Sequence, residues 1–75
     1  MPIGNRMQNQ LEELLTAGAA IEVPAVGKTP NQLLDLAVCA KRNGGHLTLT
    51  GVGSYTHIQL IELARTGAGH ITLKD

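Results

Sequence analysis

Residues 29–50 read TPNQLLDLAVCAKRNGGHLTLT and carry the signals for one helix followed by one strand. Thr29 is a typical N-cap residue, Pro30 suits the first helical position, and Gln32 is spaced to complete a capping box. Apolar residues then recur close to a 3.6-residue period, which predicts an amphipathic helix with one buried stripe made of Leu33, Leu34, Leu36, Ala37 and Ala40. After a glycine pair of the kind that ends helices, the alternation Leu47-Thr48-Leu49 predicts a half-buried strand.

The same order of signals occurs three times along the chain. Three segments read Gln, Leu, variable, acidic, Leu, and small or apolar, at residues 10–15, 32–37 and 59–64. Each is followed by glycine and then by a short alternating run, at residues 21–23, 47–49 and 71–73. In the first and third segments the predicted buried stripes are Leu11, Leu14 and Leu15, and Leu60, Ile61, Leu63 and Ala64. This internal repetition predicts three tandem helix–strand units, about 5–28, 29–54 and 55–75, within one domain covering 1–75.

The predicted helix starts differ in strength between the three units. Thr56 and Gln59 repeat the spacing of Thr29 and Gln32, whereas Asn5 and Gln8 give a weaker version of it. We therefore expect capping boxes at the second and third helices and a less well capped first helix.

The order helix, strand, helix, strand predicts an α/β fold with parallel strands joined by right-handed crossovers. We expect a three-stranded parallel sheet in the order 1-2-3, with all three helices on one face, as in a short solenoid. The strand alternation directs six apolar residues to the helices: Ile21, Val23, Leu47, Leu49, Ile71 and Leu73. The opposite face then carries Glu22, His46, Thr48, Thr50, His70, Thr72 and Lys74.

This arrangement resembles the leucine-rich-repeat-like α/β solenoids. The resemblance rests on the short strands Leu47-Thr48-Leu49 and Ile71-Thr72-Leu73 and on the leucines of the adjoining helices. Gly51 and Val52 stand where that family carries an asparagine ladder after the strand. Proteins of that family bind other proteins on the open sheet face, so the resemblance implies protein binding.

Composition excludes several classes of partner. Six basic and six acidic residues are scattered along the chain, and Tyr55 is the only aromatic residue, so neither a basic patch nor a stacking platform for nucleic acid is expected. No apolar run is long enough for a membrane span. Residues 1–6 lack the apolar stretch of a signal peptide and Cys39 is the only cysteine, so we expect a cytoplasmic protein without a cofactor.

The face without helices is the leading candidate for function. Parallel sheets are normally covered on both faces, and the sequence contains no elements for the second layer. A small, purely aliphatic core also benefits from a partner. We therefore predict a non-enzymatic protein-interaction or self-assembly module, most simply a homo-oligomer, that uses the open sheet face or an edge. Charged residues and a proline at the two outer strands, Glu22, Pro24, Lys74 and Asp75, are typical guards of such edges.

Two alternatives remain open. Gly27, Lys28 and Thr29 precede the second helix and match the end of a phosphate-binding loop, which predicts a small-ligand or anion site there. A second glycine loop, Gly51, Gly53 and Ser54, occupies the equivalent place before the third helix. Alternatively, His46 and His70 would stand side by side on neighbouring strands, about 5 Å apart, and share a metal ion.

Overall fold

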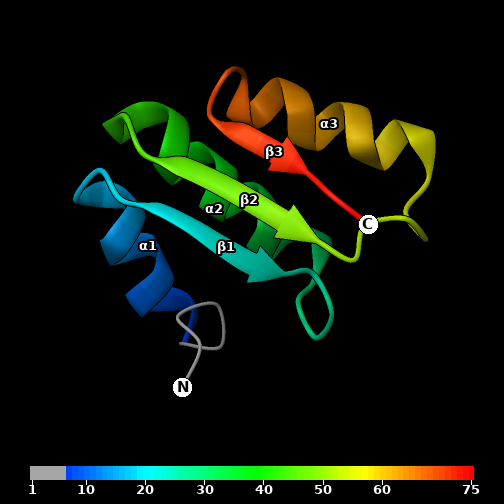
Figure 1. Cartoon of the computed structure of the whole chain (residues 1–75), viewed down its shortest axis with the longest axis horizontal. Helices are drawn as coiled ribbons and strands as arrows, with labels where there is room; N and C mark the ends of the chain where they lie inside the picture. The colour runs from blue at the N-terminus through cyan, green and yellow to red at the C-terminus, as the bar shows by residue number, and fades with distance from the viewer. Residues whose placement is uncertain (1–6) are drawn as a thin grey trace.

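A computed structural model describes residues 7–75 and gives an α/β fold in which helix and strand alternate along the chain (Figure 1). The elements are α1 (Gln8–Thr16), β1 (Ala20–Pro24), α2 (Pro30–Asn43), β2 (His46–Thr50), α3 (His57–Gly67) and β3 (Ile71–Leu73). Residues 5–6 of the predicted first unit, including the proposed Asn5 cap, lie outside the described residues. None of the helices in 7–75 is both long and apolar enough to cross a membrane.

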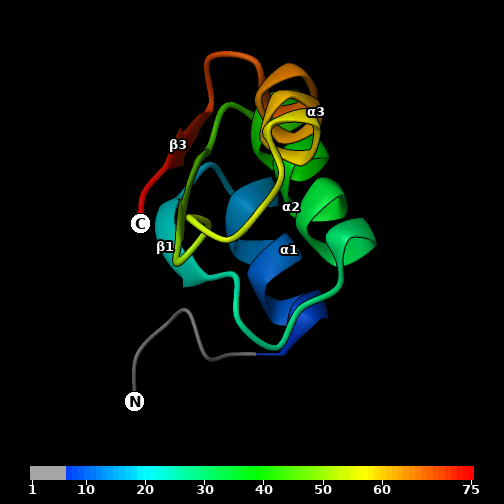
Figure 2. The same ribbon diagram turned by 90° about the vertical axis from the view of Figure 1, so that its right-hand side faces the viewer.

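The three strands form one parallel sheet in the order β1-β2-β3, as the sequence predicted. Ile21 pairs with Leu47, and Leu47 pairs with Ile71, so the three alternating runs are aligned residue for residue. Figure 2 shows that all three helices lie on the same side of this sheet. The predicted α/β class, the strand order and the one-sided helical layer are therefore confirmed.

Helices α2 and α3 begin with the same pair of reciprocal hydrogen bonds. The Thr29 hydroxyl accepts from the Gln32 N–H at 3.2 Å, while the Gln32 side-chain oxygen accepts from the Thr29 N–H at 2.9 Å. Thr56 and Gln59 repeat both bonds with the same lengths. These bonds satisfy backbone donors that a helix start leaves unpaired, so the predicted capping boxes are confirmed.

The start of α1 differs from the prediction. Its N-cap is Met7, whose N–H donates to the side-chain oxygen of Gln10 at 3.3 Å. Gln8, the expected capping partner, instead donates from its side chain to Glu12 and to the backbone carbonyl of Gln32, each at 3.0 Å. The third residue of each helix is thus a glutamine that turns back to its own N-cap, whereas Gln8 joins α1 to α2.

The turn from α2 into β2 depends on two adjacent glycines. Gly44 ends the helix at φ 77°, in the left-handed region that glycine adopts without steric penalty. Gly45 is buried, and a Cβ atom there would lie 2.8 Å from the carbonyl oxygen of Ala19. Only a residue without a side chain lets this turn pack directly on the turn between α1 and β1.

An aliphatic core fills the space between the helices and the sheet. Seven large side chains are completely buried: Leu11, Leu15, Val23, Leu33, Leu36, Leu47 and Leu49. The prediction of inward strand residues holds fully for β1 and β2, whereas Ile71 and Leu73 in β3 are half-buried. The outer strand and outer helices have a neighbour on one side only, which leaves part of their apolar stripe uncovered.

The predicted buried stripe of α3 is partly wrong, because α3 has a neighbouring helix on one side only. Ile61 and Ala64 were expected to be buried, but both are exposed, and Leu60 is only half-buried. Leu14 in α1 is also half-buried. In α2, which has a helix on each side, the predicted stripe is buried except for the half-buried Leu34.

Replacement of Leu36 tests the core. Leu36 is fully buried, so Leu36→Asp places a charge in an apolar layer and we expect it to unfold the domain, because such burial is very costly without a partner. Leu36→Ala should lower the free energy of unfolding by about 2–5 kcal/mol. Circular dichroism with chemical denaturation measures both effects. Asp35→Ala, at the adjacent exposed position, is the control and should leave stability nearly unchanged; a folded Leu36→Asp protein would disprove the helix phase.

The capping boxes make a second prediction. Thr29→Ala removes the oxygen that accepts from Gln32 and should destabilise the protein by about 1 kcal/mol. Thr29→Ser keeps that oxygen and should retain most of the stability. The denaturation midpoints of the two variants measure the contribution of the cap, and equal losses in both would show that the hydroxyl contributes nothing.

Candidate functional site

The sheet surface that carries no helix presents a regular array of mostly polar side chains. We call seven of them the open face: Glu22, His46, Thr48, Thr50, His70, Thr72 and Lys74. The register places Glu22, Thr48 and Thr72 in one row across the three strands. No element within residues 7–75 covers this surface (Figure 2). The register therefore brings Glu22, His46, Thr48, Thr50 and Thr72 to one surface, and the ion pair with Glu22 places Lys74 beside them, whereas His70 precedes β3 and contacts the backbone of Gly45.

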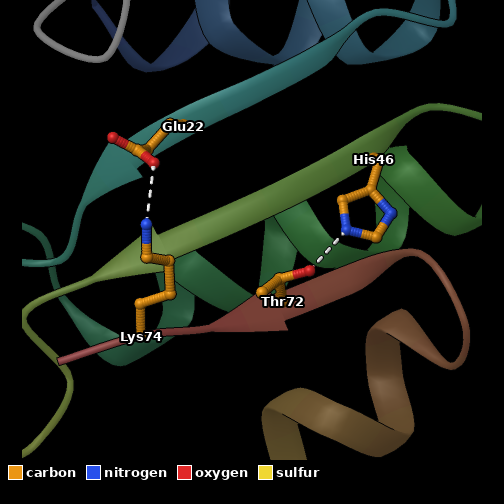
Figure 3. Close-up of polar contacts among 4 residues, drawn as sticks. All are labelled: Glu22, His46, Thr72 and Lys74. Atoms are coloured by element: carbon orange, nitrogen blue, oxygen red, sulfur yellow. Dashed lines mark hydrogen bonds and ion pairs between the residues drawn. The ribbon is translucent and has the colours of Figure 1, made fainter.

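Two polar contacts cross the open face (Figure 3). The His46 ring nitrogen Nε2 lies 2.7 Å from the Thr72 hydroxyl on the neighbouring strand. The Lys74 ammonium lies 3.7 Å from a Glu22 carboxylate oxygen, so this ion pair spans the middle strand. Both charged side chains are more than half exposed, at 56% and 62%, and such pairs contribute little to stability in water. The open face is therefore accessible to a partner.

The two predicted metal-binding histidines make different hydrogen bonds. His46 contacts Thr72 through Nε2, while Nδ1 of His70 lies 2.9 Å from the carbonyl oxygen of Gly45. His57 is the first residue of α3 and belongs to a different end of the fold. Among residues 7–75, no group of three or more His, Cys, Asp or Glu side chains is arranged to hold a metal ion.

The predicted anion-binding loop uses several of its donors internally. The Lys28 ammonium donates to the side-chain oxygen of Gln8 at 3.0 Å, and the Lys28 N–H donates to the Ala25 carbonyl at 3.1 Å. The Thr29 N–H is taken by Gln32 at 2.9 Å, and the next residue is a proline without an N–H. Gly27 adopts φ 82° and shapes the turn. The loop therefore forms the N-terminal start of α2, and the bond between Lys28 and Gln8 joins it to α1.

The second glycine loop also has a structural role in the turn between β2 and α3. Gly51 adopts φ 73° directly after the strand, and Val52, only 3% exposed, anchors the loop in the core. Gly53 lies close to the side chain of Asp75. Ser54 is exposed, and nothing in the described contacts brings a base to its hydroxyl.

Cys39 packs at the contact between α1 and α2. It is half-buried against the core. Burial raises the pKa of its thiol, the negative charge of Glu12 adds to this rise, and a hydrogen bond from Thr16 opposes it. A raised pKa lowers the thiolate fraction at neutral pH, which disfavours a nucleophilic role.

Helix α3 has an exposed apolar surface that the sequence analysis did not predict. Ile58 is 70% exposed and Ile61 is 36% exposed. A signal was present, because the residues at the position of Ile58 in the other two helices are Asn9 and Asn31. A shallow groove runs beside this helix on the α2 side, lined by Pro30, Leu34, Tyr55, Gln59, Glu62 and Leu63.

Comparison with known proteins finds no match to a family model, to a curated protein or to a solved structure.

The internal bonds of Lys28 lead to a prediction about anions. We expect phosphate to raise the melting temperature no more than sodium chloride of equal ionic strength, because Lys28 and Thr29 already have partners. Thermal melts over a phosphate titration test this. A phosphate-specific increase that disappears in Lys28→Ala would contradict the prediction and would establish an anion site in this loop.

Proposed function

We propose that this chain is a non-enzymatic protein-interaction module that self-associates, and that it is a short solenoid of three helix–strand repeats. Two observations support the repeat. Each helix has a glutamine at its third position that accepts from its own N-cap, at Gln10, Gln32 and Gln59. The three strands are aligned so that equivalent residues of the repeat pair with one another.

The single-sided helical layer is the observation that carries the proposal. A parallel sheet normally has helices on both faces, because the crossover connections between its strands place them there. Here the open face has no cover from residues 7–75 (Figure 2), and Thr48 and Thr50 would offer hydroxyl groups to a partner. Such side chains make hydrogen bonds without the strong charge that would keep copies apart.

The size of the core supports association as well. A domain of 75 residues buries only about 60% of the surface that its unfolded chain exposes, which leaves small domains marginally stable. The buried core of residues 7–75 is aliphatic, and the one aromatic side chain, Tyr55, is only half-buried against it. Contact with a second chain would bury further apolar surface and stabilise the folded state by mass action.

Catalysis has less support from the described contacts. The two histidines of the open face contact a threonine hydroxyl and a backbone carbonyl. The one thiol has a raised pKa. These arrangements lack the nucleophile and base within hydrogen-bond reach that covalent catalysis requires.

The mass of the protein in solution tests the proposal. We expect light scattering to give a weight-average mass above the 7.9 kDa of one chain, rising with protein concentration and unchanged by a chelator. A mass of one chain at every concentration would disprove self-association. An assembly that chelator dissolves would instead indicate a metal held by His46 and His70.

A further inference from the structure

The side of α3 that faces away from α2 carries exposed apolar residues. Ile61 and Ala64 are exposed there, three residues apart. Residues at this spacing lie along one side of a helix. Leu60 and Ile71 are only half-buried beneath them. The apolar surface therefore continues from α3 onto the outer strand β3.

In the other two helices the equivalent positions contact the next helix. The first residue of α1, Gln8, bonds the backbone of α2, and the fifth, Glu12, lies close enough to Cys39 in α2 to affect its pKa. The first and fifth residues of α2, Pro30 and Leu34, line a groove together with Gln59 and Leu63 of α3. The first and fifth residues of α3 are His57 and Ile61, and both are exposed.

The opposite end of the molecule presents the complementary surface. Two positions of α2 that face α1 are its third residue, Gln32, and its tenth, Cys39. The same positions in α1 are Gln10 and Ala17, and both are exposed. Leu14, between them, is half-buried, although its counterpart in α2, Leu36, is fully buried. Within residues 7–75, the outer sides of α1 and α3 therefore leave exposed the helix positions that a neighbouring helix covers in α2.

The two edges of the sheet match in the same way. The Leu47 N–H donates to the His70 carbonyl, and the Lys74 N–H donates to the Leu49 carbonyl. The backbone N–H and C=O groups of Ile71 and Leu73 therefore point away from β2, toward the free edge of the sheet. At the other edge, the backbone groups of Ala19 and Ala25 bond to β2. The backbone N–H and C=O groups of Ala20 and Glu22 therefore point toward the free edge of β1. A parallel pair between these edges would continue the sheet in its existing register.

Charge favours the same arrangement. Lys74 already reaches across a strand to Glu22 within one chain. If β1 of a second copy lay beside β3, its Glu22 would stand on the strand next to Lys74 and not two strands away. An exposed pair contributes at most about 1 kcal/mol, so it would set orientation more than strength.

We propose that a second copy of this chain stacks on the outer side of α3 and β3 with its own α1 and β1. The interface is heterologous: Ile61 and Ala64 of one copy contact Gln10, Leu14 and Ala17 of the next, and β3 pairs in parallel with β1. This inference rests on the proposed self-association and assigns it to the two edges of the sheet with their outer helices, and not to the open face. Because each stacked copy leaves one free end of each kind, assembly proceeds by addition to a growing stack.

Two charge variants test the two ends separately. Ala64→Arg alters the α3 end and Ala17→Arg alters the α1 end, both at exposed positions where circular dichroism should find the fold intact. Sedimentation equilibrium should show that each variant alone loses association by at least about tenfold relative to the wild type. An equimolar mixture should form a complex of two chains that does not grow, because each variant supplies the end that the other lacks. Ile61→Lys serves as a second variant of the α3 end.

Asp35→Arg, at an exposed position of the middle helix α2, is the matched control and should associate like the wild type, whereas Thr48→Lys reports on the open face. Loss of association in Thr48→Lys but not in the end variants would overturn end-to-end stacking while self-association stands. A mixture of the end variants that stays monomeric, or an α1-end variant that still dimerises, would also overturn it. A wild-type protein that is monomeric throughout would overturn both proposals.

Discussion

The aliphatic layer between the helices and one face of the sheet is the contact on which the rest of the structure depends. Val23, Leu47 and Leu49 from the strands meet Leu15 and Leu36 from the helices, and all are completely buried. Because the helices lie on this face alone (Figure 2), their crossovers repeat the same right-handed path and the strands stay parallel and in register. The open face and the two unpaired ends are direct consequences of that one-sided packing.

Local spacing was enough to predict much of this fold. Thr29 with Gln32 and Thr56 with Gln59 are capping boxes whose bonds form within a single turn, so their geometry does not depend on distant residues. The strand alternation likewise fixes which side of the sheet a residue occupies, which is why Glu22, Thr48 and Thr72 fall in one row across the three strands. The wrong assignments, Ile61 and Ala64, depend on whether a neighbouring helix is present, and periodicity alone carries no such information.

The contacts of the candidate sites were less predictable than their positions. His46 begins β2 and His70 directly precedes β3, but each bonds a different group, because side-chain direction depends on rotamers and on the backbone nearby. Lys28 lies in a loop that resembles an anion site in sequence, yet it contacts Gln8, 20 residues earlier in the chain. Such a contact follows only from the packing of α1 on α2.

The free edges of β1 and β3 are poorly suited to pairing with an unrelated strand, yet they are complementary to each other. Pro24 directs no N–H toward the outer edge of β1, so a ladder along that edge would be confined to Ala20 and Glu22. The strand that would pair there, β3, has only three residues. A short ladder contributes little alone, and association then requires α3 and α1 to bury apolar surface at the same time. In the proposed stack, this requirement favours a second copy of the chain over an unrelated strand, because a second copy supplies a helix at the matching distance from its strand. The proline thereby selects against simple edge-to-edge pairing while leaving the stacked arrangement available.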